Sequence, residues 1–321
     1  TYEKHLKVSS SGGKMSSFVI WILIGLLAVI LGAGLYFAGR VVLPRVIPSE
    51  KTYEIEVRHG KLDEVEFNRW PKQYVKIRSP HNYLINAIYI PHPNANKTVD
   101  LSHGFTYSLF GMVKYAPMFR KRGFNVLIYD LRHHGKTGGW NTTFGFYEKL
   151  DLKAVVTWAY DKLGTGGKVG VFGESLGAAL SLQHAALDPR ISFVIADCPF
   201  SDLKELLAYR LRSEFHLPAF PLLPVSSMFC WAFTGMAFHK VSPLREMPEI
   251  EAPILLIHGD QDTFVPKEMS IALLDAAKNS RLTRIYLAPQ AEHAEAFWTN
   301  PTAYEQQVDA FLRDIQAIPR G

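Results

Sequence analysis

The stretch KVGVFGESLGAALSLQHAAL, residues 168–187, decides the fold. KVGVF is typical of a buried strand, and the residues from Ser175 onward follow a helical pattern. Between them, residues 173–177 read G-x-S-x-G. This pattern indicates a strained strand-to-helix turn that lifts the serine hydroxyl above a sheet, with glycines where a Cβ would clash. The helix N-terminus behind the serine favours developing negative charge, so we expect Ser175 to be a nucleophile.

A serine hydroxyl is a weak nucleophile at neutral pH and needs an adjacent base, which a third group orients. Around this kind of turn the chain order is Ser, then Asp or Glu, then His. Asp260 and Asp262 both follow the strand ILLIH, and we favour Asp262 because it lies deeper in the loop. Asp260 is then a turn-forming or solvated carboxylate. His293 follows the last strand, so we predict that it is the base and that Asp262 holds its tautomer.

A tetrahedral intermediate also needs two backbone N–H donors. One is expected from Leu176, the residue after the nucleophile, and the other from the loop SHGFT at residues 102–106. We assign the second donor to Phe105, because Gly104 lets the loop backbone approach closely. His103 is interpreted as a hydrogen-bonding residue that shapes the loop rather than as a second base.

Short apolar runs alternate with helical patterns from about residue 74. This alternation predicts an α/β fold, with a mostly parallel central sheet flanked by helices. The expected strands are Tyr74–Arg78, Tyr83–Ile90, Lys97–Ser102, Phe124–Tyr129, Lys168–Phe172, Ile191–Ala196, Ile254–His258 and Leu282–Leu287. The expected helices are Tyr107–Arg122, Phe146–Leu163, Ser175–Leu187, Pro266–Lys278 and Phe297–Ile315. Residues 199–250, rich in aromatic, Leu and Pro residues, interrupt the rhythm and predict a small helical cap.

The segment FVIWILIGLLAVILGAGLYFA, residues 18–38, carries no charge and is long enough to span a bilayer. We interpret it as a single-pass N-terminal anchor in the cell membrane. A cleaved signal peptide and a buried helix are the alternatives. Lysines before it and basic residues after it leave its orientation open, with the extracytoplasmic side favoured for the catalytic domain. The expected organisation is a flexible tail at 1–17, the anchor, a juxtamembrane linker at 39–72 and one domain at 73–321.

The amino-acid composition narrows the classes of ligand and partner that the protein is expected to bind. A hydrophobic share of 48% allows a substantial core, and the net charge of +5 is scattered and comes with no nucleic-acid motif. Cys198 and Cys230 have no zinc-like spacing, and we expect two buried free thiols, although spacing alone leaves their pairing open. The sequence therefore predicts no metal, no cofactor and no nucleic-acid partner, and it does not fix the oligomeric state.

The chain resembles the α/β-hydrolase superfamily, and within it the membrane-anchored bacterial hydrolases of the YqkD type. The matching segments are HGFT at 103, YDLRHHGKTGG at 129, FGFYEKLDL at 144, GESLG at 173, IADCPFSD at 195, AYRLRSEFHLPAFPLLP at 208, HGDQDTFVP at 258 and EHAEAFWTNPTAYEQQVDAFL at 292. The resemblance implies the α/β-hydrolase fold, the triad of Ser175, Asp262 and His293, and a structural turn at 130–135. Asp100 departs from the family, which usually has an aliphatic residue there.

These observations favour a serine hydrolase that cleaves small-molecule or lipid-like acyl esters through an acyl-enzyme intermediate, with a preference for short to medium chains. A serine peptidase or amidase would use the same triad. A catalytically idle membrane scaffold is the alternative from another class, and the intact triad speaks against it. Serine rather than aspartate at the turn disfavours a dehalogenase.

Overall fold

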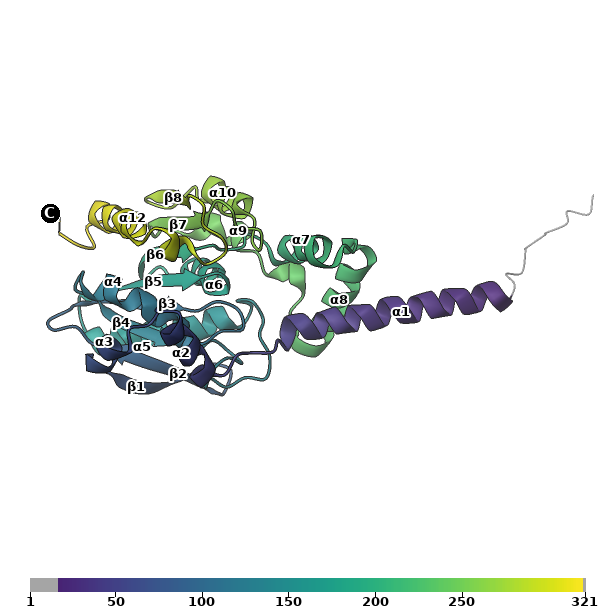
Figure 1. Ribbon diagram of the computed structural model, residues 1–321, viewed down its shortest axis with the longest axis horizontal. Coiled ribbons are helices and arrows are strands. Elements are labelled where there is room, and N and C mark those ends of the chain that lie inside the picture. The colour runs from purple at the N-terminus through teal and green to yellow at the C-terminus, as the bar shows by residue number, and fades with distance from the viewer. Residues whose placement is uncertain (1–16, 320–321) are drawn as a thin grey trace, which may run out of the picture.

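The computed structural model describes residues 17–319, so the predicted tail lies almost wholly outside the described residues. An eight-stranded sheet forms the centre, in the order β1-β2-β4-β3-β5-β6-β7-β8 (Figure 1). The β1–β2 and β2–β4 pairs are antiparallel and the other five pairs are parallel, which confirms the predicted sheet. The strands are β1 Gln73–Arg78, β2 Leu84–Ile90, β3 Lys97–Ser102, β4 Asn125–Tyr129, β5 Lys168–Glu174, β6 Ile191–Asp197, β7 Ile254–Gly259 and β8 Thr283–Ala288.

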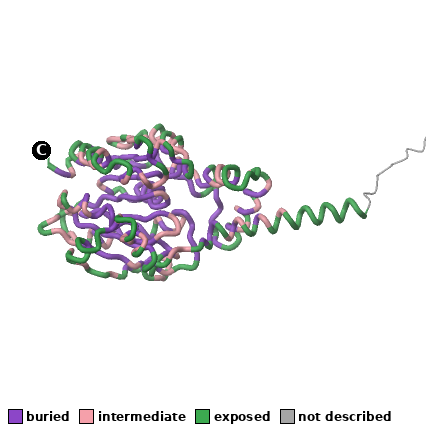
Figure 2. The backbone as a smooth tube through the Cα atoms, viewed as in Figure 1, coloured by how far each residue is buried: buried purple, intermediate pink, exposed green. Residues whose placement is uncertain are grey.

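Helices cover both faces of the sheet, and successive strand residues point to opposite cores. In β4, Leu127 packs on one face and Ile128 on the other. The sheet is accordingly buried through its middle (Figure 2). The helices are α1 Ser17–Val42, α2 Ser49–Arg58, α3 Glu64–Arg69, η1 Leu109–Tyr115, α4 Ala116–Arg120, α5 Glu148–Leu163, α6 Leu176–Ala185, α7 Leu203–Phe215, α8 Ala219–Thr234, η2 Phe238–Lys240, α9 Pro243–Glu246, η3 Met247–Glu249, α10 Lys267–Ala276, α11 Ala296–Thr299 and α12 Pro301–Asp314.

Two predicted helices are divided. The first becomes η1 followed by α4, with Pro117 at the start of α4. The last becomes α11 and α12, and it breaks where Pro301 follows Asn300. Proline has no N–H and disfavours helical backbone before it, while the Asn300 side chain accepts a hydrogen bond from the Ala303 N–H and caps the new helix.

The segment predicted as a juxtamembrane linker is structured. Its helices α2 and α3 pack against the domain, and Phe67 of α3 is buried in the core. The Tyr107 hydroxyl donates a hydrogen bond of 2.7 Å to Glu56 of α2. The α2 sequence is largely polar, so its buried face carries no apolar pattern from which a packed helix could be predicted.

Residues 199–250, here called the cap, form α7, α8, η2, α9 and η3. Helix α8 lies along the last turns of α1 (Figure 1). The approach is close, because a Cβ added to Gly34 of α1 would lie 2.4 Å from Val225 of α8. Cys230 of α8 packs near Ala38, and Cys198 and Cys230 are both buried and free.

Helix α1 projects away from the rest of the described chain for most of its length, as the exposed tube in Figure 2 shows. Among residues 17–319 it is the single unbroken helix long and apolar enough to cross a membrane. Helix α8 and residues 238–249 together form a bent apolar pair that could make a second, broken span. The cap therefore lies between the apolar helix α1 and the sheet.

Candidate active site

The turn between β5 and α6 has the strained geometry expected of G-x-S-x-G. Ser175 has φ +55°, a conformation that non-glycine residues rarely adopt. A Cβ on Gly173 would lie 2.1 Å from the Gly177 carbonyl oxygen, and a Cβ on Gly177 would lie 2.0 Å from that of Ser102. Only glycine fits at either position, so the sequence forces the serine outward on the tight turn.

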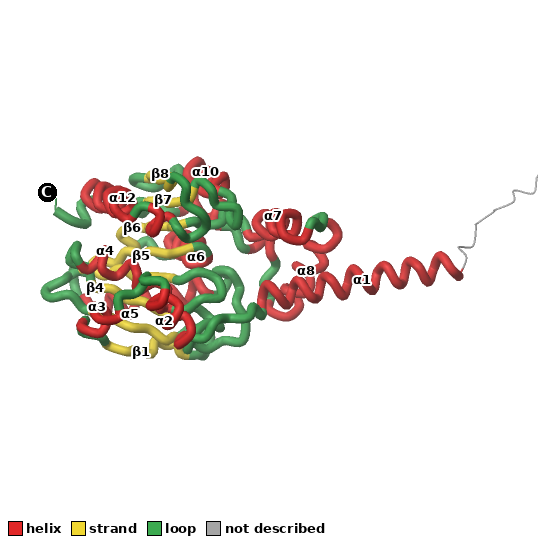
Figure 3. The backbone as a smooth tube through the Cα atoms, viewed as in Figure 1, coloured by secondary structure: helices red, strands yellow, loops and turns green. Residues whose placement is uncertain are grey.

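Loops gather at the carboxyl edge of the sheet (Figure 3), where parallel α/β sheets commonly bind ligands. The structure brings the three predicted side chains together at this edge. Ser175 Oγ lies 2.9 Å from His293 Nε2, and His293 Nδ1 lies 2.6 Å from Asp262 Oδ2. With Nδ1–H donating to the carboxylate, Nε2 is left to accept the serine proton. The arrangement can carry a proton from an alcohol to an imidazole.

Asp262 is held as a carboxylate by more groups than the sequence predicted. Its Oδ1 accepts hydrogen bonds from the N–H groups of Phe264 and Val265, at 2.9 and 2.8 Å. His258 Nε2 lies 3.2 Å from Oδ2. Burial acts to raise the Asp262 pKa, but hydrogen bonds from His258 and His293 outweigh it and hold that pKa well below its usual range. Sequence reasoning missed His258, although it is the next-to-last residue of the strand before this loop.

Asp260, the alternative carboxylate, points elsewhere. Its Oδ1 accepts a hydrogen bond of 2.7 Å from the Gln290 N–H, which ties the loop after β7 to the loop after β8. This is the turn-forming role considered for it in the sequence.

The two predicted oxyanion donors are free. Within residues 17–319, neither the Phe105 nor the Leu176 N–H donates to another protein group. Two buried histidines hold the Phe105 loop. His103 Nδ1 donates to the Gly104 carbonyl at 2.7 Å, and its Nε2 accepts from the Leu131 N–H at 2.9 Å.

His134 supports the same loop from the predicted structural turn. Its Nε2 accepts from the Thr106 N–H at 3.1 Å, and its Nδ1 donates to the Arg132 carbonyl. Burial lowers the pKa of His134 to about 3 and that of His103 to about 4, so both imidazoles are neutral and act as fixed hydrogen-bonding groups. Neither is placed to deprotonate Ser175.

A charged network lies behind the serine, on the sheet side. Glu174 Oε2 lies 2.7 Å from Lys114 Nζ and accepts a hydrogen bond from Tyr115. Burial would raise the pKa of Glu174, but the Lys114 ammonium lowers it, so the pair is ionised. Asp197 accepts from the Tyr304 hydroxyl at 2.9 Å. Burial, then the Glu174 charge, raises the Asp197 pKa to about 7.

Asp100, the departure from the family pattern, is fully buried in β3. Within the described chain neither of its carboxylate oxygens has a hydrogen-bond partner. Burial raises its pKa well above the usual range, so the group is a neutral acid. The strand nevertheless keeps its register with β4 and β5 up to Ser102, so Asp100 leaves the backbone that enters the Phe105 loop in place.

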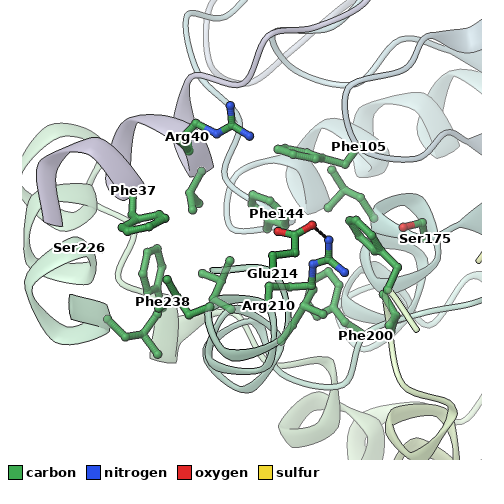
Figure 4. Close-up of a pocket in the computed structure, with 18 of the residues that line it drawn as sticks. Phe37, Arg40, Phe105, Phe144, Ser175, Phe200, Arg210, Glu214, Ser226 and Phe238 are labelled. Carbon is green, nitrogen blue, oxygen red and sulfur yellow. Dashed lines mark ion pairs between the residues drawn. The ribbon is translucent and has the colours of Figure 1, made fainter. Parts of the chain in front are cut away.

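An apolar cavity of about 360 Å³ lies in front of Ser175 (Figure 4). Its walls come from the Phe105 loop, the cap and the end of α1. Phe264 stacks on His293 with ring centroids 4.8 Å apart, and the Arg210 guanidinium lies 3.7 Å from the Phe264 ring centroid. Arg210 is also paired with Glu214 (Figure 4). Arg210 of the cap therefore contacts Phe264, and Phe264 in turn contacts the base His293.

Among residues 17–319, one group of side chains has ligand atoms close enough for a metal, namely Cys198, Asp262 and His293. The donor set fits a metal poorly. His293 Nδ1 and Asp262 are already hydrogen-bonded, and burial raises the pKa of the Cys198 thiol well above its ordinary value, which opposes the thiolate that a metal needs.

Comparison with known proteins agrees with this geometry. Residues 51–222 match the family model described as X-Pro dipeptidyl-peptidase (S15 family). The Bacillus subtilis protein YqkD is 35% identical over 90% of this chain and 95% of its own length. The Pyrococcus furiosus esterase Pf2001 superimposes with a TM-score of 0.65 at 27% identity, covering 79% of this chain and 94% of the esterase.

A more distant structural neighbour is a peptidase. The Pyrococcus horikoshii acylaminoacyl peptidase shares the fold at a TM-score of 0.56 and 15% identity, over 78% of this chain and 43% of the peptidase. The fold is therefore common to esterases and peptidases. Together, the family match over more than half of the chain and the similarity to YqkD show that the chain is an α/β-hydrolase belonging to the S15 family.

Proposed function

We propose that the protein is a serine hydrolase that cleaves carboxylic esters. The observation that carries the proposal is the hydrogen-bonded series Ser175–His293–Asp262 at the base of an apolar cavity. An apolar cavity with a few convergent polar groups is the usual form of a small-molecule site.

The geometry supports an acyl-enzyme mechanism. His293 Nε2 takes the proton of Ser175 as Oγ bonds to the ester carbonyl carbon, and the N–H groups of Phe105 and Leu176 hold the oxyanion. The C–O bond to the alcohol then breaks, and the imidazolium returns its proton to the leaving alkoxide. His293 then takes a proton from water as its oxygen bonds to the acyl carbon. The bond from that carbon to Ser175 Oγ breaks, Oγ takes the proton back from the imidazolium, and the acid leaves. Asp262 stabilises the imidazolium throughout.

Peptide-bond cleavage is the second candidate, because the matching family model is named for a dipeptidyl-peptidase. Such an enzyme must hold the charged N-terminal ammonium of its substrate, which calls for a carboxylate without a cationic partner. Glu214 is the single acidic residue among those lining the cavity, and Arg210 already neutralises it. Among the residues lining the cavity there is therefore no carboxylate left to bind a substrate ammonium group.

We also propose that α1 is a retained membrane anchor. Its last turns pack against α8 through Gly34 and Ala38, and Phe37 lines the cavity. Cleavage of α1 as a signal peptide would remove one wall of the site.

Activity-based labelling tests the function. The full chain should react with a fluorophosphonate probe, and Ser175→Ala should lose all labelling and all hydrolysis of p-nitrophenyl butyrate. Ser213→Ala, an exposed change in the cap, is the matched control and should behave like wild type. The wild type should cleave the butyrate ester far faster than Ala-Pro-p-nitroanilide. Unchanged labelling of Ser175→Ala would overturn the proposal, and a preference for the anilide would favour the peptidase.

A further inference from the structure

The anchor helix forms part of the cavity that holds Ser175. Phe37, Arg40 and Val41 of α1 line it, opposite the serine (Figure 4). Phe37 also packs edge-to-face on Phe215 of the cap, with ring centroids 5.0 Å apart. A helix that served only as a tether would have no reason to enter the active site.

The length of α1 places this wall at the membrane boundary. Its 26 residues make a helix about 39 Å long, whereas the hydrocarbon core of a bilayer is about 30 Å thick. A span that begins near Ser17 therefore leaves the hydrocarbon around Phe37. The turn that follows, with Val41 facing the cavity and exposed Arg40 at its rim, lies where basic side chains reach the headgroups.

The cap carries large apolar side chains on its outside, beside the same part of α1. Phe220 is 78% exposed, Trp231 61% and Phe233 55%, all on α8. Exposed apolar patches of this kind mark membrane or protein contacts, and aromatic side chains gather at bilayer interfaces. Since α8 packs directly on α1, these exposed side chains belong to the cap helix that lies next to the apolar helix.

We infer that the substrate is a long-chain amphiphilic ester that enters from the bilayer. Its acyl chain lies between α1 and the cap, against Phe37 and Val41, and its carbonyl carbon reaches Ser175. This inference rests on the ester hydrolase function proposed above and names its substrate class. The sequence alone favoured short to medium chains, and we infer a longer chain because the cavity runs from Ser175 to α1.

The route of entry can be tested with the full chain reconstituted in phosphatidylcholine vesicles. Methylumbelliferyl palmitate is placed either in the same vesicles as the protein or in separate ones, and methylumbelliferyl butyrate is added from water. Palmitate in the same vesicles should be hydrolysed about tenfold faster or more, because the shared bilayer raises its effective concentration at the cavity. Butyrate should show no such difference. Equal palmitate rates from both vesicle populations would overturn bilayer entry.

The wall formed by α1 can be tested separately. Val41→Phe narrows the cavity and should lower the palmitate-to-butyrate rate ratio about tenfold, while Phe37→Ala removes contact area and should lower it several-fold. Leu35→Phe, on the exposed face of the same helix, is the matched control and should leave both rates unchanged. Fluorophosphonate labelling verifies that each variant is folded.

The outcomes separate the two proposals. If wild type neither labels nor cleaves butyrate, the hydrolase function itself fails. If butyrate is cleaved but both α1 variants keep the wild-type ratio, the hydrolase function stands and the inferred acyl route is wrong.

Discussion

The two sides of the Ser175 turn have opposite chemistry. On the cap side, the cavity is apolar and its one carboxylate is paired. On the sheet side, Lys114 and Glu174 form a buried ion pair, and Asp197 lies within its field. Ser175 thus lies between a largely apolar cavity and a buried charged network.

This difference shows how an α/β-hydrolase can place buried charge close to a largely apolar cavity. The carboxylate of Glu174 lies close to the Phe105 loop, since a Cβ on Gly104 would be 3.7 Å from its Oε1. An unpaired anion there would repel the oxyanion that forms during acyl transfer. The Lys114 ammonium pairs with the Glu174 carboxylate on the sheet side of Ser175, so the cavity itself can remain largely apolar.

The largest expected effect comes from the carboxylate that orients the base. Asp262→Asn should leave the fold intact and lower kcat/KM for p-nitrophenyl butyrate by about 10³–10⁴-fold, because the imidazole loses its carboxylate and its tautomer is no longer fixed. Asp260→Asn, in the same loop, keeps an acceptor for the Gln290 N–H and is the matched control. Similar losses in both variants would show that loop structure, not the charge of Asp262, matters.

Substitutions in the charged network on the sheet side of Ser175 should change the stability of the protein. Lys114→Met leaves the buried Glu174 charge unpaired and should lower the free energy of unfolding by about 3–5 kcal/mol, measured by urea titration in detergent with tryptophan fluorescence. Adding Glu174→Gln should restore most of that loss. Lys121→Met breaks the more exposed pair with Glu305 and should cost about 1 kcal/mol or less. Equal losses from Lys114→Met and Lys121→Met would contradict the contrast between buried and surface charge.

The smallest expected effect is a pH dependence due to Asp197. Its folded pKa of about 7 lies above the ordinary 3.8, so between these values the folded state binds a proton that the unfolded state releases. Its contribution to stability is therefore greatest below pH 4, and it falls by on the order of a few kcal/mol as the pH rises to 7. Asp197→Asn should remove this part of the slope in unfolding titrations at several pH values. Asp275→Asn, at an exposed site, should keep the wild-type slope.

The sequence predicted those parts of the site that depend on local pattern. Gly173 and Gly177 can be identified by spacing because the turn excludes any Cβ at both positions. The loops that carry Asp262 and His293 follow recognisable apolar strands, and the chain order places them after the serine. Alternating apolar runs likewise predicted a mostly parallel sheet.

The remaining parts depend on contacts between distant segments. Lys114 and Glu174 are 60 positions apart, and neither has a local pattern that indicates a partner. His258 lies near the end of β7 and contacts Asp262 only after the following loop folds back. The order of the strands, with β3 between β4 and β5, also arises from packing of the whole sheet rather than from any single segment.

The fit of Gly34 of α1 against Val225 of α8 has a consequence for how the anchor can vary. An unrelated apolar helix of the same length would be as hydrophobic, but a side chain at position 34 would collide with Val225 and push the helix away from the cap. The helix would then separate from the cap, and the cavity would lose the wall that Phe37 and Val41 form. The sequence of α1 is therefore constrained by its close packing on α8 as well as by the need for hydrophobic residues.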